Sequence, residues 1–328
     1  MKKILFQESL SVRKQPKNLT DKDLRLFSHE FEKKIPESYI FFEKKIYSFN
    51  SIIFSLRKFK NFKKYSFFGD KTFIERTKII IKNYLLSTKK VKTIEKGTWF
   101  TDNKSHVYFH WILDALERSE LAIDYLDEYP LLVPEEFFKK DFIAESLDFL
   151  GLNYLILKNN HVYKINELLI TSKTAETGNY NEKILKNLIN RFKFNANKPI
   201  VKTNKNIFIY RDSKIGRNIQ NFEEIKHILE KHKYEVINFE DYSYDEKIAI
   251  LKYCENLLGM FGSGLSNMIF LDEARNLIEI RNLNDYKNNA FYSLSSACDL
   301  NYYYLFFELK DDGCYVDPMI LDNLLNKL

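Results

Sequence analysis

Short apolar runs alternate with amphipathic stretches through the second half of the chain. Strand-like runs cover residues 206–210, 235–239, 256–261 and 277–280, and helix-like patterns cover 221–231, 244–254 and 264–271. Strands that alternate with helices at this spacing predict a parallel, doubly wound sheet. Asp317 followed by Pro318 predicts a closing helix over 317–328, because aspartate caps helices and proline fits their first turn.

The first half has a weaker pattern that still favours an α/β domain. Apolar residues recur at helical spacing over 106–126, with Ser105 as the expected N-cap, and 134–150 has a second helical pattern. Strand-like runs lie at 129–133, 154–157 and 167–170. Upstream, 70–86 has the apolar spacing of an amphipathic helix.

The domain boundary is expected where the pattern becomes polar. Polar stretches at 171–180 and 191–204 indicate a linker or boundary between residues 171 and 204, and a length of 328 residues favours two domains. We therefore expect an α/β domain over 1–190, a Rossmann-like domain over 191–312 and a C-terminal helix over 313–328.

Composition narrows the class of protein. Cys254, Cys298 and Cys314 are scattered, which suggests neither a disulfide framework nor a cysteine zinc site, and favours a reducing, cytoplasmic setting. The first ten residues lack the apolar stretch of a secretory signal, and no window has the length of apolar sequence that a membrane span needs.

Positive charge is concentrated in the first third. Residues 1–100 carry 24 Lys+Arg against 10 Asp+Glu, whereas the remainder carries 27 against 35. Such a basic region suits peripheral contact with an anionic membrane surface, an anionic glycan or nucleic acid. A solvated lysine-rich surface explains the same charge equally well.

The glycine turn over 259–264 is the first candidate binding element. It joins a strand to a helix, and ligands of parallel sheets bind where strands end and turns lead into helices. The amides of Gly262, Ser263 and Gly264 would approach a phosphate closely, helped by the helix dipole. A turn made of small residues for tight packing is the alternative interpretation.

Charged residues follow two of the predicted strands. Arg211 ends the strand 206–210 and Arg217 follows in the same loop, and guanidinium groups bind phosphate in a planar, bidentate way. Surface ion pairs with nearby acidic residues are the alternative. Glu279 lies near the end of 277–280, where a carboxylate can accept the hydroxyls of a ribose or can be an ordinary strand-end residue.

The predicted helix 106–126 contributes a candidate base. His110 and Asp114 are four residues apart, so they share a helix face. A histidine or aspartate beside a sugar hydroxyl serves as a general base, whereas a histidine beside tryptophan is also common as a hydrogen-bonded core residue.

Three segments, in this order, resemble glycosyltransferase family 61, which includes bacterial capsular polysaccharide biosynthesis proteins. Residues 106–118 are similar to the family's aromatic-flanked His-Trp followed by Asp and then Arg. Tyr210-Arg211 with Arg217 and Asn221 resembles its Ser-Arg, Arg and Asn-Glu pattern. Residues 259–267, which end at Asn267, and then Glu279 resemble its glycine turn and the acidic residue after it.

The resemblance implies a GT-B-like fold, in which two Rossmann-like lobes face each other across a cleft. It implies an inverting transfer, without bound metal or other cofactor, from a nucleotide-linked sugar, most simply a UDP-sugar. The acceptor would be a glycan or lipid-linked glycan bound by the first lobe, as in capsule or lipopolysaccharide synthesis, and no nucleic-acid partner is expected. The catalytic residues would be Asp114 and His110. The donor would be bound by Arg211, Arg217, Asn221, Gly262, Ser263, Gly264, Asn267 and Glu279.

This sequence departs from the family at three positions. Phe261 stands where the family usually has His, Phe222 where it usually has Glu, and Ser266 where it has Thr. Phe261 removes a side chain able to contact the leaving group, which leaves the turn's amides for that task. A catalytically silent nucleotide- or glycan-binding protein is therefore the second hypothesis. A dehydrogenase is disfavoured, because no G-x-G-x-x-G follows an early strand.

Overall fold

The computed structural model divides the chain into two compact units. The described residues are 2–49, 51–58, 60–62, 65, 75, 78, 81–82, 85, 91–197, 204–210, 219–310 and 313–328. The first unit comprises Met1–Ser9 and Pro36–Ala175, and the second comprises Leu10–Ile35 and Glu176–Leu328. The chain thus passes between the units three times.

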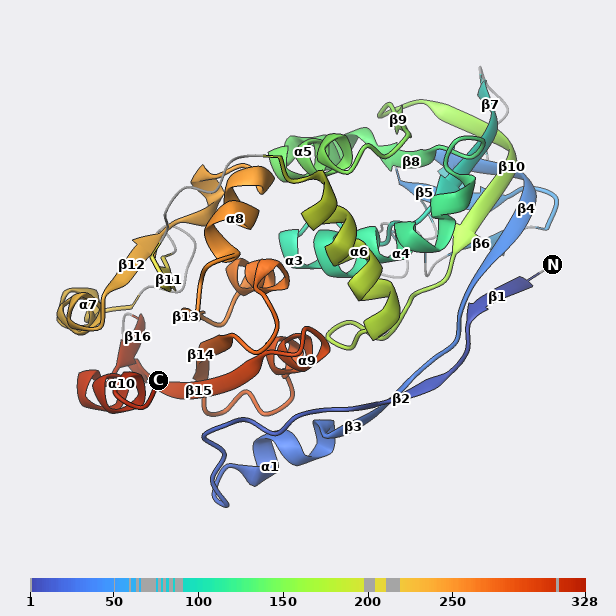
Figure 1. Cartoon of the computed structure of the whole chain (residues 1–328). Coiled ribbons are helices and arrows are strands. Elements are labelled where there is room, and N and C mark those ends of the chain that lie inside the picture. Colours follow the sequence, from blue (N-terminus) through green and yellow to red (C-terminus); the bar gives the residue numbers. More distant parts are fainter. Residues whose placement is uncertain are drawn as a thin grey trace. The chain divides into compact units, whose positions relative to one another are not determined.

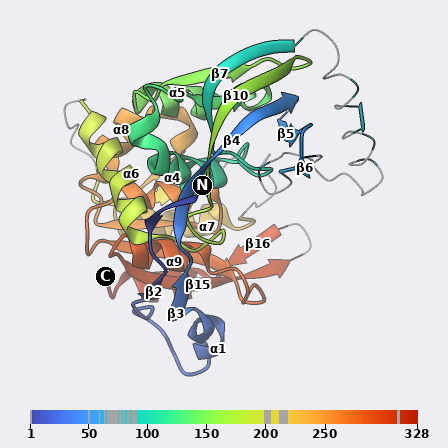
Figure 2. The same ribbon diagram turned by 90° about the vertical axis from the view of Figure 1, so that its right-hand side faces the viewer.

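The described strands of the first unit form one mixed sheet. They are β1 Lys2–Phe6, β4 Ser38–Phe49, β5 Ile52–Ser55, β6 Lys60–Asn61, β7 Val91–Trp99, β8 Leu131–Pro134, β9 Tyr154–Leu157 and β10 Val162–Thr171. The order is β6-β5-β4-β10-β7-β8-β9, with β1 paired to β4. Strands β10, β7, β8 and β9 pair in parallel, whereas β4 pairs antiparallel with β10 (Figure 2). The carboxyl ends of β7 and β10 therefore meet at one edge.

The helices of the first unit follow β7 and β8. They are α3 Tyr108–His110, the π-helical turn η3 Trp111–Ala115, α4 Leu116–Ser119 and the 3-10 helix η4 Glu120–Tyr125, then η5 Glu135–Lys139 and α5 Asp141–Phe149. The helix predicted over 106–126 is thus confirmed as one helical stretch, with changing hydrogen bonding. The N-cap prediction is wrong, because Val107 begins the stretch and Ser105 Oγ instead accepts a 2.9 Å bond from Asp102 N. The helix predicted over 70–86 lies mostly outside the described residues.

The second unit contains the parallel sheet that the sequence predicts. The described strands of this sheet are β11 Asn206–Ile209, β12 Tyr234–Ile237, β13 Asn256–Met260, β14 Asn276–Asn282, β15 Asn301–Lys310 and β16 Gly313–Val316. The order is β12-β11-β13-β14-β15-β16, and all pairs are parallel except β15 with β16 (Figure 1). Strand order reverses between β11 and β13, which is where ligands bind in sheets of this kind.

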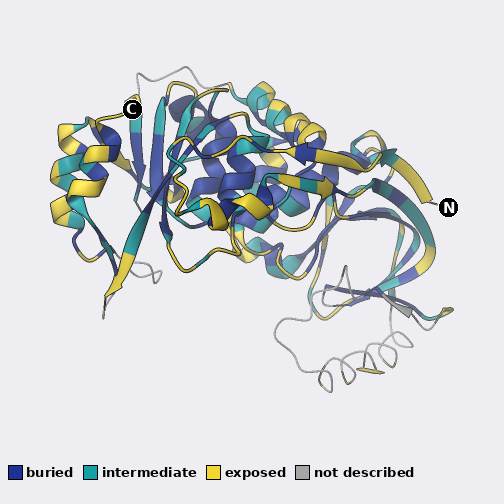
Figure 3. Cartoon of the chain, turned by 90° about the horizontal axis from the view of Figure 1, so that it is seen from below, coloured by how far each residue is buried: buried dark blue, intermediate teal, exposed yellow. Residues whose placement is uncertain are grey.

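Helices cover both faces of this sheet. They are α6 Glu182–Asn195, α7 Phe222–Lys231, η7 Phe239–Asp241, α8 Tyr244–Leu251, the 3-10 helix η8 Ser263–Phe270, α9 Ala290–Ala297 and α10 Pro318–Leu325. Apolar residues of α7 and α10 pack with Leu258, Ile278 and Leu305 in one core cluster. On the other face, α6, α8 and η8 meet through the rings of Phe192, Tyr244 and Phe270. Figure 3 shows buried residues inside each unit and exposed residues on outer helix faces.

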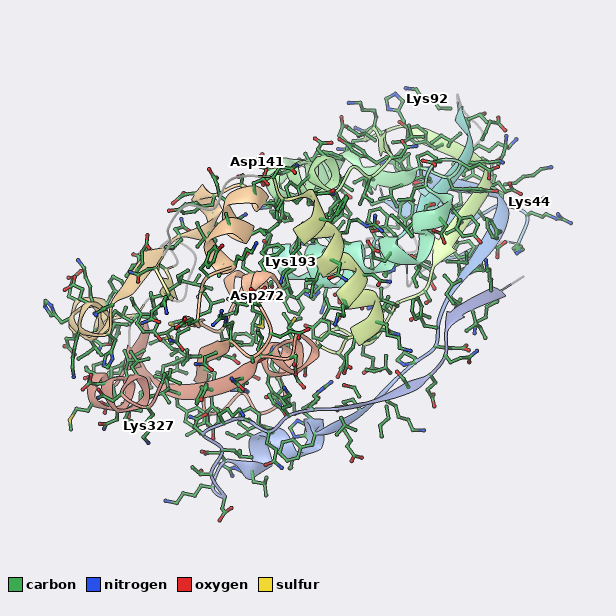
Figure 4. The ribbon with its side chains drawn as sticks, in the orientation of Figure 1. Lys44, Lys92, Asp141, Lys193, Asp272 and Lys327 are labelled. Carbon is green, nitrogen blue, oxygen red and sulfur yellow. The ribbon has the colours of Figure 1, made fainter. Side chains whose placement is uncertain are left out.

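Helix α6 lies within the stretch 171–204, which the sequence predicts as a linker or boundary. The division between the units falls in that stretch, at Ala175. The stretch also contains a capped helix, which its polar composition does not indicate. Asn181 caps α6, and Lys193 Nζ is 3.0 Å from Asp272 Oδ1 just after η8 (Figure 4). A mixed α/β fold is therefore confirmed, whereas the GT-B arrangement and the functional limits 1–190, 191–312 and 313–328 stay predictions.

A segment near the start of the chain packs on the second unit. We call Leu10–Ile35 the N-terminal strap; it includes most of β2 Ser9–Val12, together with α1 Leu24–Phe27, η1 Ser28–Glu30 and β3 Glu32–Ile35. The Asn18 side chain pairs with the backbone of Tyr304, donating to its carbonyl at 2.7 Å and accepting from its N–H at 3.2 Å. Phe27 is buried against β15 and α9. Part of the basic first third is thus integral to the second unit.

Four asparagines link the parallel strands at their amino ends. Asn301 donates to Asn276 at 3.1 Å, Asn276 to Asn256 at 2.7 Å, and Asn256 to Asn206 at 2.8 Å. Asn206 then donates to the His232 carbonyl at 2.9 Å. These residues are directly paired across β11, β13, β14 and β15, so this asparagine ladder records the register of the sheet.

Among the helices that the structure describes, none combines the length and the apolar character needed to cross a bilayer.

Replacing the central asparagine should weaken the second unit. Asn256→Ala removes the donor to Asn206 and the acceptor of Asn276. Because partly buried amides lose partners, we expect the free energy of unfolding to fall by about 1–2 kcal/mol, measured by denaturant unfolding.

Asn323→Ala provides the matched control for this ladder variant. Asn323 lies on the exposed face of α10, so the same chemical change should alter the free energy of unfolding by less than about 0.5 kcal/mol. Equal losses in both variants would mean that the ladder does not stabilise the sheet.

Candidate functional site

The π-helical turn Trp111–Ala115 carries the candidate base. Trp111 anchors the turn, because its side chain is buried and its indole N–H donates to Ser146 Oγ in α5 at 2.8 Å. Such turns insert one extra residue into a helix and occur frequently at functional sites. The turn therefore fixes Asp114 on a rigidly packed element.

His110 and Asp114 form a hydrogen-bonded pair. His110 Nδ1 and Asp114 Oδ2 are 2.7 Å apart, and both side chains are largely buried, at 16% and 13% exposed. An aspartate in this position holds an imidazole in one orientation. The structure thus brings together the two predicted catalytic residues in a proton-accepting arrangement.

Two further charged residues lie close to this pair. Asp102 follows the carboxyl end of β7, and the Arg118 guanidinium donates to the Thr171 carbonyl at the end of β10 at 3.0 Å. Both residues are buried, and Arg118 lies over the Tyr65 ring at 5.4 Å. Because β7 and β10 are parallel neighbours, their ends place these groups at one edge of the sheet.

The charges in this group act on one another. Burial alone raises the pKa of Asp102, but the attraction of Arg118, a hydrogen bond from Lys104 N and the charge of Lys173 outweigh it, so the pKa lies below its usual value. Burial lowers the pKa of Arg118, against the opposing attraction of Asp102. The edge of this sheet thus holds an ionised carboxylate and a buried guanidinium beside the His110–Asp114 pair.

Asp102 and Arg118 are functional candidates that are recognised from the structure and not from the sequence pattern. Arg118 belongs to the segment that resembles the family, yet nothing in its spacing tells that the guanidinium is buried. Asp102 follows the strand-like end Trp99-Phe100, so an acidic residue after a buried strand was the available signal.

The second candidate region lies where the order of the parallel strands reverses. Ile209, at the end of β11, pairs directly with Gly259 of β13, and Phe261 N donates to the Ile280 carbonyl at 2.8 Å. Gly262, Ser263 and Gly264 follow at this edge and begin η8. The predicted glycine turn therefore lies at the carboxyl edge of the sheet, as expected.

Glycines allow η8 to lie close to the sheet. A Cβ at Gly264 would lie 3.1 Å from the Ile209 side chain, and one at Gly259 would lie 3.1 Å from Leu265. The tight-packing interpretation is thus correct for these two positions.

Glu279 lies beside this turn but is buried. It pairs across the sheet with Gly259, and its side chain is 1% exposed. Burial raises the pKa of Glu279, partly offset by the charge of Arg281 and a hydrogen bond from Tyr302. Glu279 thus lies in the predicted strand, but the prediction of a position near the strand end is wrong, because β14 continues beyond Glu279 to Asn282.

Two predicted donor residues have their side chains engaged within the second unit. The Asn221 amide pairs with the Val316 backbone, donating at 2.7 Å and accepting at 3.1 Å. The Asn267 amide donates to the Gly264 carbonyl at 2.8 Å, which fixes the glycine turn. Arg211 and Arg217 lie outside the described residues, so their place at the edge stays a prediction.

Within the described ranges, no cluster of three or more His, Cys, Asp or Glu residues has an arrangement that could hold a metal ion.

The low pKa of Asp102 predicts a pH-dependent contribution to stability. Its ionised form stabilises the fold above the unfolded-state pKa of about 3.9, and this contribution is lost as the pH falls through the lower folded-state pKa. Asp102→Asn should therefore lower the melting temperature near pH 7, and its difference from wild type should shrink below about pH 4.

The control for this measurement is Asp127→Asn, at an exposed position in the same unit. Its difference from wild type should be small at every pH. A constant difference for Asp102→Asn between pH 7 and pH 3 would contradict the electrostatic origin of its effect.

A comparison with known proteins places both candidate regions in one family. The family model described as Glycosyltransferase 61 matches residues 108–278, from the start of α3 into β14. The match includes the His110–Asp114 pair and the glycine turn, and it ends one residue before Glu279. No curated protein matches the sequence. Family membership implies glycosyltransferase activity, a sugar donor and a glycan acceptor. Because the match spans more than half of the chain, this protein belongs to glycosyltransferase family 61.

Proposed function

We propose that the chain transfers a sugar from a nucleotide donor, a UDP-sugar, to a hydroxyl of a bacterial surface glycan with inversion at the anomeric carbon. The observation that carries the proposal is that the family match contains both a hydrogen-bonded His–Asp pair and a glycine turn at the reversal of strand order. A single displacement needs one group for the acceptor proton and another for the leaving diphosphate, and these two elements supply such groups.

In the proposed step, Asp114, assisted or replaced by His110, takes the proton of the acceptor hydroxyl. The hydroxyl oxygen bonds to the anomeric carbon as the bond from that carbon to the diphosphate breaks. The charge that develops on the diphosphate would be stabilised by Arg211, Arg217 and the amides of Gly262–Gly264, because guanidinium groups and helix N-termini favour phosphate.

Glu279 is proposed to accept hydroxyl groups of the donor's ribose. Its position beside Gly259 on the same edge as the glycine turn supports this role. The side chains of Asn221 and Asn267, by contrast, hold Val316 and the turn, so we propose that they act on the donor through the backbone they position.

The acceptor and location are proposed from the family and from charge. A capsule or lipopolysaccharide glycan, carried on a lipid, would be glycosylated at the inner face of the plasma membrane. The basic first third, with 24 Lys+Arg against 10 Asp+Glu, supports peripheral contact with anionic lipid.

A catalytically silent nucleotide- or glycan-binding protein is the second candidate. Phe261 stands where the family usually has His, and its ring packs edge-on against Phe291 at 5.2 Å. This aromatic contact supplies no hydrogen bond to a leaving group, which favours binding without turnover.

Removing the proposed base should reduce turnover while leaving donor binding intact. We expect Asp114→Asn and His110→Ala each to lower kcat by about 10²-fold or more, because positioned general bases contribute that much. Steady-state rates with a working donor and acceptor provide the measurement.

The matched control is Asp124→Asn, an exposed aspartate later in the same helical stretch. It should retain wild-type kcat. Full turnover by both Asp114→Asn and His110→Ala would refute this assignment of the base.

A thermal-shift screen tests the donor class. A ligand that binds the native state at about 100 times its Kd adds about 2.7 kcal/mol, which raises the melting temperature by several degrees. We expect a nucleoside diphosphate and its sugar conjugate to give this shift. The absence of a shift with every common nucleoside diphosphate would contradict the proposal, and a shift without turnover over a broad acceptor panel would favour the silent binder.

A further inference from the structure

A chain of hydrogen bonds leads from the N-terminal strap to Glu279. The Asn289 side chain donates to the Leu26 carbonyl at 2.8 Å and accepts from Arg281 Nη1 at 2.9 Å. Arg281 Nη1 also donates to Tyr302 Oη at 3.2 Å, and Tyr302 Oη donates to Glu279 Oε2 at 2.5 Å. Three side chains thus join a backbone carbonyl of the strap to one oxygen of the Glu279 carboxylate.

The arrangement fixes one carboxylate oxygen and leaves the other available. Tyr302 donates to Oε2, whereas Oε1 is buried and has no hydrogen-bond partner among the described residues. A buried carboxylate oxygen without a partner is costly, and a bound group that donates a hydrogen bond to it offsets that cost. A ligand hydroxyl is the kind of group that Oε1 would accept.

The N-terminal strap also packs against this hydrogen-bond network through Phe27. Phe27 is completely buried, 5.0 Å from the Arg281 guanidinium, and its ring contacts Tyr292 at 5.2 Å and Tyr302 at 6.0 Å. Arg281 is held further by the carbonyls of Asp285 and Asn288, at 2.9 and 3.2 Å. Removal of water from around these groups strengthens the hydrogen bonds between them.

We propose that Tyr302, supported by Arg281, Asn289 and the N-terminal strap, is a positioning residue that orients Glu279 Oε1 toward a ribose hydroxyl of the donor. The proposal rests on the proposed function, which gives Glu279 its ligand. It adds that a segment near the start of the chain, outside the family match at 108–278, determines how the donor half distinguishes ribose from deoxyribose.

The network has a mechanical role as well as an orienting one. Glu279 is 1% exposed, so a hydroxyl reaches Oε1 only after neighbouring side chains shift. The Tyr302 bond keeps the carboxylate from rotating toward Arg281 during that shift. Without the Tyr302 hydrogen bond, both carboxylate oxygens of Glu279 compete for the Arg281 guanidinium. The carboxylate then no longer prefers a ribose hydroxyl at one fixed position.

The test uses the full chain and compares a nucleoside diphosphate with its 2′-deoxy and 3′-deoxy analogues by calorimetry. UDP, GDP, ADP and CDP are screened first, and the one that binds is used. We expect wild type to bind the ribonucleotide at least tenfold more tightly than one of its deoxy analogues. Tyr302→Phe should weaken ribonucleotide binding about fivefold to tenfold and leave deoxynucleotide binding nearly unchanged, so the ratio falls toward one.

Tyr234→Phe is the matched control, because Tyr234 is also buried in the second unit and its hydroxyl has no hydrogen-bond partner among the described residues. It should keep the wild-type ratio. If Tyr302→Phe fails to fold, Asn289→Ala provides the test instead. It removes the link to the strap and should also reduce the ratio of ribonucleotide to deoxynucleotide affinity.

The outcomes separate this inference from the function on which it rests. A folded Tyr302→Phe with the wild-type ratio overturns the positioning role and leaves the donor proposal intact. A wild-type chain that binds no nucleoside diphosphate, or does not distinguish the deoxy analogues, overturns the assignment of Glu279 to the ribose and this inference with it. An equal loss of affinity for the ribonucleotide and for its deoxy analogue in Tyr302→Phe would mean that Tyr302 acts only on the stability of the fold, which also overturns the positioning role.

Discussion

Parallel pairing of strands is the constraint on which both candidate regions depend. Parallel strands all end at one edge, so residues far apart in the sequence are brought together there without direct pairing. In the first unit this rule joins Asp102 after β7 with Thr171 at the end of β10, beside which Arg118 is held. In the second unit it sets Glu279 next to Gly259 and the turn that follows. Strand ends thus hold the charged groups of the first unit, whereas in the second unit the end of β13 leads into the glycine turn beside mid-strand Glu279.

Burying charge next to those ends imposes a second requirement, since an isolated buried ion is costly. Each unit places a guanidinium against an accepting oxygen and an aromatic ring: Arg118 against Thr171 and Tyr65, and Arg281 against Asn289 and Phe27. The environments differ in their effect on the nearby carboxylate, because the pKa of Asp102 falls and that of Glu279 rises. Burial of Glu279 therefore outweighs the attraction of its arginine.

Local pattern predicted the elements whose sequence repeats a clear period. The structure has three sets of elements where the sequence predicts them: strands β11 to β14 with their helices, the Asp317 cap, and the helical stretch around His110. Long strands β4 and β10 were missed or shortened, because lysines interrupt their apolar alternation. The strap was not predictable, since its partner Tyr304 lies nearly 300 residues away and only tertiary packing selects it. Likewise, spacing identified Glu279 but gave no information on its burial, which depends on Tyr302 and η8.

The asparagine ladder constrains how this sequence can diverge. All four amides donate in the same direction along the sheet, and the oxygens of Asn206, Asn256 and Asn276 each accept from the next asparagine. Changing Asn256 or Asn276 alone to an apolar residue removes a hydrogen-bond partner from two neighbouring asparagines, whereas changing all four together leaves no asparagine of the ladder without its partner. We therefore expect Asn206, Asn256, Asn276 and Asn301 to covary in related chains, as a single evolutionary unit scattered over four strands.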